Sequence, residues 1–524
     1  MVNLGVLNGG NNSTSYGVSA DGSVVVGTSN DGAAGFNSRA FRWTQAGGMV
    51  SLGVLNGGLH SDARGVNADG GVVIGNAKDG AAANVDSAFR WTQAGGMVSL
   101  GMLNGGNYSS AYSVSGDGSV VVGQASDGAV GNVGRAFRWT QAGGLVTVEQ
   151  WLRNGGVPVP VDVTDSAYGV SANGSVVVGQ LGNGRAFIAR LTPPPVNSPP
   201  SSNPSSNGPP ASSGMIDVVN YQGSLAGAGN VTSLALNGAE MVMHGAHGSP
   251  TRGRVDAGQS AFWANGDVGD NGHDRFGGSL SSAEVGLAHS WGNGLQGNIA
   301  LGHQSETQGL ELGGETRMRG TYVMPELIWQ ATDSLYATFS GYYQRGSASV
   351  RRGYWNAGVT DYSRGDTGTE VIGLRARLDW LDAWKLGEAN LTPYTSLTAT
   401  RAKVDGYTET GGGFPARWDG RSESATVLRA GVDAVLPVGG NVSLLGRLEL
   451  ANRFQGAGST ATGEILGLSG FGVGGQEQRK SWLRTGVGVE GKLGQAGTVS
   501  LMLNATTQGS APAYWLAAGY RMSF

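Results

Sequence analysis

The stretch that decides the fold is Tyr514-Trp-Leu-Ala-Ala-Gly-Tyr-Arg-Met-Ser-Phe524. Every second residue counted back from Phe524 is apolar or aromatic, and the other positions are small or polar, as at Ser523 and Arg521, with Trp515 as the exception. Because side chains alternate between the two faces of a strand, this pattern predicts a strand with one apolar face and one polar face. In a soluble sheet such a strand would leave an adhesive edge, whereas a closed outer-membrane barrel has no free edge.

Composition narrows the class of protein. The 524 residues include 94 Gly and no Cys, only 14% are charged, and the net charge is −4. Gly disfavours helices, so many short strands joined by Gly-rich turns are expected. The absence of Cys excludes disulfides and thiolate metal sites, and the charge gives no reason to expect nucleic-acid binding. We expect no cofactor, no metal and no enzymatic activity, because no nucleophile–His–acid set accompanies His60, the one histidine among residues 1–192.

The second half of the sequence alternates in the same way as its last strand. In the stretch from Leu444 to Phe454, leucines occupy one face while Arg447, Glu449 and Arg453 occupy the other. Charges inside and apolar residues outside are typical of a membrane barrel. The predicted lumen-facing charges are Arg447, Glu449, Arg453, Arg484, Glu490, Lys492 and Arg521. The twelve predicted strands are 256–269, 277–291, 294–307, 317–332, 334–350, 367–382, 388–405, 420–436, 440–456, 478–492, 496–506 and 513–524.

The connections between these strands fall into two classes. Those after even-numbered strands are short, and those after odd-numbered strands tend to be long, notably 351–366, 405–420 and 455–477. Outer-membrane barrels have short periplasmic turns and long external loops. An even strand count would place Phe524 on the periplasmic side, with the last strand closing against the first.

Residues 1–192 contain four repeats of about 48 residues. Leu7-Asn-Gly-Gly recurs at Leu55 and Leu103 and, in degraded form, as Arg153-Asn-Gly-Gly. Each repeat holds four short strand candidates, which is the size of a propeller blade. Residues 1–5 match the fourth strand of a repeat and could complete the last blade of a closed ring. A solenoid of two coils per repeat and a fragment of a larger ring are the alternatives.

Two segments separate the repeats from the predicted barrel. Residues 193–214 are rich in Pro, Ser and Asn, which predicts a linker that holds a folded head away from its anchor. Residues 215–255 have partly helical character and are long enough to thread a bilayer-deep pore. The sequence shows no signal peptide before the first repeat, so we expect an export signal upstream of Met1.

The segment from Arg254 to Gly269, the twelve strands and Phe524 resemble the translocator domain of type V autotransporters. The repeats resemble extracellular His-Ala-Phe (HAF) repeats, with Arg39, Ser87, Arg135 and Arg185 in the first position of the motif. The resemblance implies an all-β protein whose monomeric barrel lies in the lipid of the bacterial outer membrane, with a helix in its lumen and its passenger at the cell surface.

The same resemblance implies partners and a function. Periplasmic chaperones and the barrel-assembly machinery would recognise the last strand through Tyr520, Met522 and Phe524. The barrel would export and anchor its own passenger, a binding or adhesion module for an unknown surface ligand with a role in virulence. The alternatives are a surface-anchored hydrolase and a channel with an accessory cap.

Overall fold

The computed structural model describes residues 2–192, 213–245, 247–271, 276–494, 496–507 and 512–524. Its internal contacts divide the chain into two compact units. The first contains Met1–Tyr221, Tyr354–Asp361 and Gly412–Phe414, and the second contains Gln222–Gly353, Tyr362–Gly411 and Pro415–Phe524. Most of the predicted linker, residues 193–212, lies outside the described residues.

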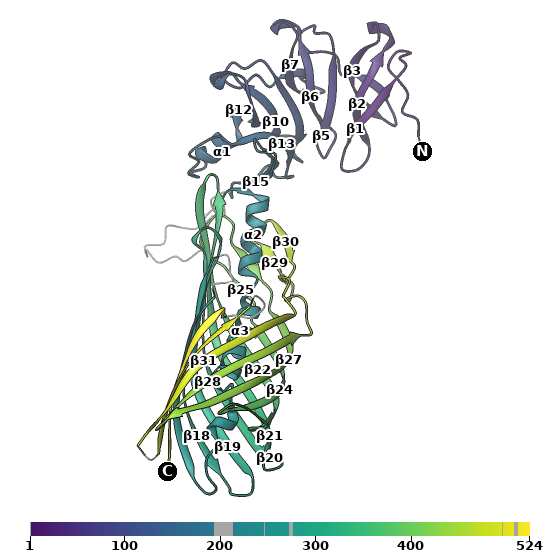
Figure 1. Cartoon of the computed structure of the whole chain (residues 1–524). Coiled ribbons are helices and arrows are strands. Elements are labelled where there is room, and N and C mark those ends of the chain that lie inside the picture. Colours follow the sequence, from purple (N-terminus) through teal and green to yellow (C-terminus); the bar gives the residue numbers. More distant parts are fainter. Residues whose placement is uncertain (1, 193–212, 246, 272–275, 495, 508–511) are drawn as a thin grey trace, which may run out of the picture. The chain divides into compact units, whose positions relative to one another are not determined.

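The second unit contains a closed antiparallel barrel of twelve strands among the described residues (Figure 1). Each strand pairs with the next along the chain, and β33 pairs with β17 to close the ring, with Phe524 and Ser260 exchanging main-chain hydrogen bonds of 2.8 and 3.0 Å. The strands are β17 (Ser260–Asp270), β18 (Gly278–Ser290), β19 (Leu295–Gly309), β20 (Glu315–Gln330), β21 (Leu335–Asn356), β22 (Val359–Trp380), β24 (Ala389–Val404), β27 (Arg421–Gly439), β28 (Val442–Arg453), β31 (Ser481–Leu493), β32 (Gly497–Thr506) and β33 (Tyr514–Ser523).

All twelve predicted strands are present. Of the predicted long connections, 405–420 lies between β24 and β27 and 455–477 lies between β28 and β31, as expected, whereas 351–366 was predicted wrongly. Segment 351–366 is mainly strand, because β21 and β22 continue to a two-residue turn at Ala357 and Gly358, both with positive φ as a tight hairpin turn requires. The other two long connections contribute a small four-stranded sheet. Its strands are β25 (Tyr407–Thr408), β26 (Ala416–Trp418), β29 (Ala461–Ile465) and β30 (Ser469–Val473), and the remaining short strand is β23 (Trp384–Leu386) in a turn.

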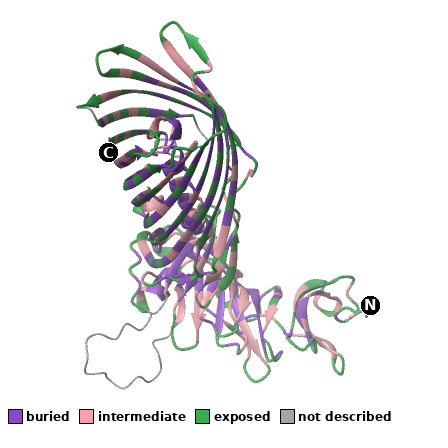
Figure 2. Cartoon of the chain, turned by 90° about the horizontal axis from the view of Figure 1, so that it is seen from below, coloured by how far each residue is buried: buried purple, intermediate pink, exposed green. Residues whose placement is uncertain are grey.

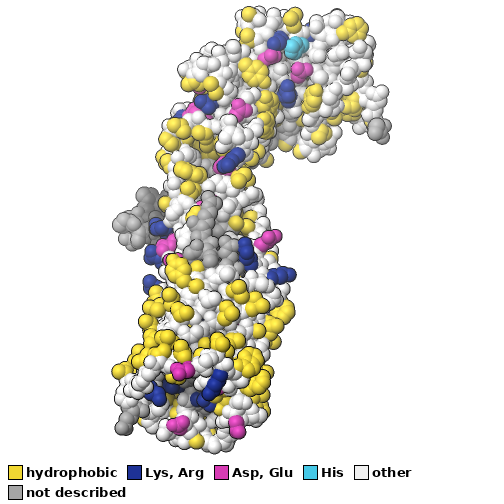
Figure 3. All heavy atoms as spheres, viewed as in Figure 1, with side chains coloured by type: hydrophobic (Ala, Val, Ile, Leu, Met, Phe, Trp, Pro, Cys, Tyr) yellow, Lys and Arg dark blue, Asp and Glu magenta, His cyan; other side chains and the backbone are white. Residues whose placement is uncertain are grey.

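The barrel wall has the predicted alternation of faces. Leu448 and Leu450 are 58% and 54% exposed, whereas Arg447 and Glu449 beside them are buried. The same banding of buried and exposed residues runs along the barrel strands in Figure 2, and hydrophobic side chains cover much of the outer barrel surface in Figure 3. An apolar outer wall around a polar interior suits a barrel surrounded by lipid.

No helix within the described residues is both long enough and apolar enough to cross a membrane.

The repeats form four four-stranded sheets in the first unit, and within each sheet neighbouring strands are consecutive in sequence. A buried phenylalanine of the Ala-Phe motif lies in the third strand of every sheet. The strands are β1 (Ser13–Val18), β2 (Val24–Asp31), β3 (Asn37–Thr44), β4 (Gly48–Ser51), β5 (Ser61–Val66), β6 (Val72–Asp79), β7 (Val85–Thr92), β8 (Gly96–Ser99), β9 (Ser109–Val114), β10 (Val120–Asp127), β11 (Val133–Thr140), β12 (Gly144–Thr147), β13 (Thr164–Val170), β14 (Val176–Leu181), β15 (Ala186–Arg190) and β16 (Gly214–Asp217).

Main-chain hydrogen bonds join each repeat to the next. Ala20 donates to Ala68, Ala68 to Gly116, and Gly116 to Ala172, at 2.9–3.1 Å. Arginines of the Ala-Phe-Arg motif add a second set of contacts, because Arg42 donates to the carbonyl of Gly70 at 3.2 Å and its copies do the same in the next two repeats. These bonds stack the repeats in sequence order.

The last sheet differs from the sequence-based expectation in two ways. Residues 2–5 form no strand, and the fourth strand is instead β16, which pairs with β15 from Arg190–Gly214 to Phe187–Asp217. The ring closure by the first residues was therefore predicted wrongly. The predicted linker follows β15 and precedes β16 in the sequence, and its residues 193–212 lie outside the described residues. A helix, α1 (Val148–Asn154), occupies the place of the fourth Leu-Asn-Gly-Gly copy.

The predicted pore-threading segment begins with β16 and continues as two helices. These are α2 (Val218–Ala228) and α3 (Val231–His244), separated at Gly229 and Asn230, and a short 3-10 helix, η4 (Pro250–Gly253), follows. The stretch expected to be partly helical is therefore helical over most of its length.

Candidate functional site: the helix-filled barrel lumen

Helix α3 lies inside the barrel (Figure 1). Polar side chains of the strands contact it from several directions. His244 Nε2 hydrogen-bonds Thr398 Oγ1 of β24 at 3.0 Å, and Thr232 Oγ1 donates to Glu423 of β27 at 2.8 Å. All four of these side chains are buried. Thr398 and Glu423 can both reach α3 because every second side chain of a barrel strand faces the lumen.

The carboxyl end of α3 and the residues after it are held by arginines that donate to main-chain carbonyls. The last carbonyls of a helix lack partners within the helix and carry the negative end of its dipole, so cations stabilise them. The barrel wall supplies these donors from four different strands. Arg375 donates to Met243 and His247, Arg377 and Arg447 to Gly248, Arg484 to His244, and Arg521 to Arg252.

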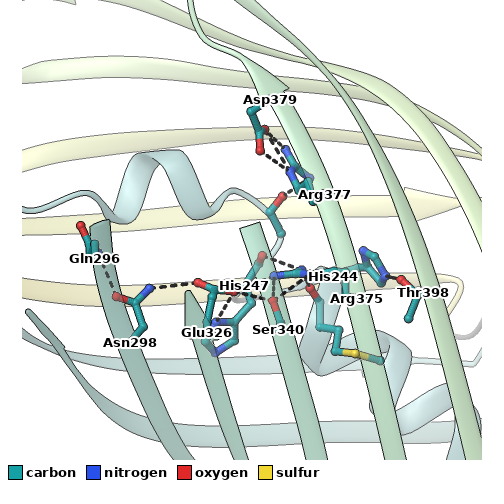
Figure 4. Close-up of polar contacts among 12 residues, drawn as sticks. His244, His247, Gln296, Asn298, Glu326, Ser340, Arg375, Arg377, Asp379 and Thr398 are labelled. Atoms are coloured by element: carbon teal, nitrogen blue, oxygen red, sulfur yellow. Dashed lines mark hydrogen bonds and ion pairs between the residues drawn. The ribbon is translucent and has the colours of Figure 1, made fainter. Parts of the chain in front are cut away.

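Several of these arginines are paired with buried carboxylates. Arg375 lies 2.7 Å from Glu326 and Arg377 lies 2.6 Å from Asp379, as Figure 4 shows. Asp433 holds Arg447 at 2.6 Å and also accepts a hydrogen bond from Ser249 at 2.9 Å. A buried charge is tolerated only when it is paired and hydrogen-bonded, and here both conditions are met.

A further ion pair ties α3 itself to the wall. Glu240 of α3 pairs with Arg429 of β27 at 2.5 Å, and Arg429 also reaches Glu449 of β28 at 2.8 Å. His247 binds Glu284 of β18 at 2.9 Å. The segment 240–252 is thus bonded to the barrel wall through both side chains and main chain, and it is held across the lumen.

The predicted lumen-facing charges occupy different environments. Arg447, Glu449, Arg453 and Arg484 are buried. Of these, Arg447, Glu449 and Arg484 belong to the set of charged side chains that holds α3 and the residues after it. Glu490 pairs with Arg252, and Arg521 donates to the Arg252 carbonyl at 2.7 Å. Lys492 is exposed, two residues beyond Glu490 toward the end of its strand.

Sequence reasoning did not single out Arg375, Arg377, Asp379 and Arg429, although they make many of the contacts. The signal was available for the first three, because they alternate with apolar residues in Leu374-Arg-Ala-Arg-Leu-Asp379 as the predicted charges do elsewhere. Their targets could not be recognised, because a main-chain carbonyl has no signature in the sequence.

The lumen is suited to holding a peptide segment. No group of His, Cys, Asp or Glu with metal-binding geometry exists within the part of the chain that the structure describes. A cavity of about 160 Å³ remains beside the segment after α3, with Ser249, Arg252, Glu490 and Arg521 in its lining.

A separate buried ion pair fixes the loop between β24 and β27. Arg352 donates to both carboxylate oxygens of Glu409 at 3.0 and 2.6 Å and to Ser224 Oγ of α2 at 3.1 Å. Trp418 Nε1 and the Ala416 main-chain NH complete the donors to Glu409 at 3.0 and 2.9 Å. Both charged side chains are fully buried. The loop is therefore closed over α2 by one bidentate pair.

In the repeats, the aspartates of the hairpin turns have structural roles. Ser19 Oγ donates to Asp21 at 2.7 Å and the Ser23 main-chain NH donates at 3.0 Å. The Ser19 hydroxyl, followed by the Ser23 donors, lowers the pKa of the Asp21 carboxyl to about 2. Ser115 and Ser119 lower the pKa of Asp117 to about 2 in the same way.

A twelve-stranded antiparallel barrel with an apolar outer wall and a polar lumen is typical of outer-membrane proteins, and in some of them a helix fills the lumen. The family model of the autotransporter beta-domain matches residues 219–506, more than half of the sequence, and the chain belongs to this family. Its barrel is therefore an outer-membrane translocator. Comparison with curated proteins gave no match.

Among solved structures, the chain is similar to the translocator domain of autotransporter NalP from Neisseria meningitidis. The identity is 16% and the TM-score 0.46, over 56% of this chain and 99% of that one. The beta domain of the Bordetella autotransporter BrkA shows 16% identity and a TM-score of 0.37, over 51% and 100% of the two chains. The transport unit of AIDA-I from Escherichia coli shows 13% and 0.30, over 52% and 91%.

Proposed function

We propose that this autotransporter displays its repeats at the cell surface as a binding module that stays attached to the barrel. The observation that carries the proposal is the role of β16. This strand completes the last sheet of the repeats and continues without interruption into α2 and then into the lumen-bound α3. The anchor thus supplies one strand of the passenger fold.

Contacts within the first unit reinforce this attachment. The Met215 main-chain NH of β16 donates to Asn356 Oδ1 at 2.9 Å, and the Ala357 NH donates to the Met215 carbonyl at 2.7 Å. Arg190 of β15 donates to the Gly413 carbonyl at 2.9 Å and lies over the Phe414 ring. Hairpin tip and loop residues therefore bind the two last strands of the passenger.

Insertion of the barrel is proposed to use the outward face of β33. Tyr520, Met522 and Phe524 are 38%, 41% and 67% exposed on one face of this strand. Their spacing offers the barrel-assembly machinery, after delivery by periplasmic chaperones, an apolar face next to the closing seam. The proposal includes a monomeric barrel, and it is supported by the closed ring, in which the twelve described strands leave no free edge for a second copy to pair with.

Of the alternatives, the channel has less support, because α3 and its ion pairs occupy the lumen. The absence of catalysis in the passenger stays a prediction.

The test of the proposed function is surface labelling of intact cells that make the full chain with its own or a supplied export signal. An epitope in the β3–β4 turn is expected on the cell surface and in the outer-membrane fraction. Recovery of the repeats mainly in the periplasm or in the medium would overturn the proposal.

A further inference from the structure

The first strand of every repeat carries a β-bulge at the same position. The pairing skips one residue between Ser15 and Gly17, and it skips the equivalent residue in β5, β9 and β13. A bulge turns the extra side chain away from the regular alternation of the strand, and bulges often re-aim a side chain at a functional site. The four bulged residues are Tyr16, Arg64, Tyr112 and Tyr168, which we call the aromatic column.

Members of the aromatic column stack on one another across repeats. The rings of Tyr112 and Tyr168 have centroids 5.6 Å apart and planes inclined by 22°, and the Arg64 guanidinium lies 5.6 Å from the Tyr112 ring. Tyr16 and Tyr168 remain 57% and 55% exposed. Four copies of one position thus carry flat side chains that are exposed or half-buried rather than part of the core. Three of the four are tyrosines, and exposed aromatic surface is typical of interaction sites.

A second column of polar side chains runs alongside the first. It consists of Thr28, Asn76, Gln124 and Gln180, each directly after the glycine that faces the bulge, and we call it the amide column. Tyr112 and Tyr168 donate from their hydroxyls to Gln124 and Gln180, both at 3.4 Å, and Arg64 donates to Asn76 at 2.9 Å. Amide side chains offer both donors and acceptors.

We propose that the aromatic column and the amide column form one binding strip for a neutral, linear polysaccharide. Sugar rings have apolar CH faces that pack on aromatic rings, and their hydroxyls suit side chains that both donate and accept, as amides do. The exposed rings of Tyr16 and Tyr168 supply apolar surface for such sugars, and one polar side chain per repeat beside the column supplies hydrogen-bond partners. The inference rests on the proposed function, since it names the ligand class of the displayed head.

Nucleic-acid bases also stack on aromatic side chains, but the charge of the repeats favours a neutral polymer. Acidic and basic residues nearly balance in residues 1–192. Two carboxylates border the strip: Asp62 accepts from Thr28 at 2.7 Å, and Asp165 accepts from Gln124 at 3.2 Å. A polyphosphate would meet these charges, whereas sugar hydroxyls can donate to them.

The test is calorimetric titration of the full chain in a detergent without a sugar headgroup. The probes are three neutral hexasaccharides, of β-1,4-linked glucose, α-1,4-linked glucose and β-1,4-linked N-acetylglucosamine, together with an oligothymidylate. Saturable binding of at least one hexasaccharide is expected. The double variant Tyr112→Ala/Tyr168→Ala should weaken it at least tenfold. The control Val98→Ala, which removes a side chain 55% exposed on β8, should change it less than twofold.

Three results would overturn the inference: no binding of any hexasaccharide, equal binding by the double variant, or binding of the oligothymidylate alone. If the double variant fails to keep the wild-type circular dichroism spectrum and melting curve, Gln124→Ala/Gln180→Ala replaces it with the same expectation. Surface labelling separates the two proposals. Correct display without saccharide binding rejects only the strip, and failed display rejects the proposed function.

Discussion

The buried pair Arg352–Glu409 gives the sharpest prediction for the loop that closes over α2. Glu409→Ala removes the carboxylate that pairs with the fully buried Arg352 guanidinium, and it removes the acceptor of the Trp418 indole NH. Removing one partner of a buried ion pair costs about 3–5 kcal/mol. At about 1.4 kcal/mol for each factor of ten, the equilibrium constant for opening the loop should increase by a factor of about one hundred to several thousand.

The assay is hydrogen exchange with mass spectrometry on the folded barrel in detergent, following peptides that cover β25, β26 and β29. The matched control is Glu464→Ala in the same small sheet. Glu464 pairs with Arg417 at 3.1 Å, but the two side chains are 41% and 57% exposed, and such a pair contributes about 0–1 kcal/mol. An equal loss of protection in both variants, or less than a tenfold loss in Glu409→Ala, would refute the reasoning.

Three further predictions follow from other parts of the chain. The Asp21 carboxyl should titrate near pH 2 by NMR, and Ser19→Ala should raise its pKa toward 3.8. Because the pKa is depressed in the folded state, the ionised Asp21 stabilises the fold fully above about pH 4, and this contribution is lost as the pH falls through 2. An Asp21 pKa near 3.8 in the wild type would contradict this. A site-specific protease sequence inserted within 193–212 should, after cutting, leave the repeats on washed cells, since β16 still pairs with β15; their release into the medium would show that the pairing does not retain them. Phe524→Ser should lower the amount of assembled barrel several-fold relative to Val499→Ser on the neighbouring strand, and equal assembly of the two variants would rule out a special role for the last aromatic residue.

The barrel could be predicted from the sequence because its pattern is local. Alternation along each strand is set by the requirement that one face meets lipid and the other meets water or protein, and it is visible in any strand such as Leu444–Phe454. The extension of β21 and β22 to the Ala357-Gly358 turn was missed, because residues 351–366 lack the regular apolar alternation that identifies the other strands.

The arrangement of the repeats was predicted less well, because it depends on pairing between distant segments. Residues 1–5 and β16 are both short, and nothing in either sequence states which one pairs with β15. The structure selects β16, whose Met215 and Ile216 are buried. The lumen site has the same limitation. The arginines could be found by alternation, but the carbonyls that they bind are common to every residue, so only the fold shows which segment they hold.

The central claim is that β33 closes the barrel against β17 in the outer membrane. Asn265 and Gly519 lie directly opposite each other across this seam, five residues from the hydrogen-bonded pair Ser260–Phe524, so they form a pair without mutual hydrogen bonds and with closely spaced Cα atoms. The chain has no cysteine of its own, so an introduced pair reports without background.

The decisive measurement is therefore disulfide formation in Asn265→Cys/Gly519→Cys, read as a mobility shift between reduced and non-reduced denatured samples of the outer-membrane fraction. The control is Asn265→Cys/Ser500→Cys, because Ser500 lies opposite Gly519 on β32, one strand farther from β17. We predict a cross-link in the first variant and none in the second, with the protein in the outer membrane. A soluble protein, or an outer-membrane protein that forms no cross-link at 265 and 519, would contradict the account.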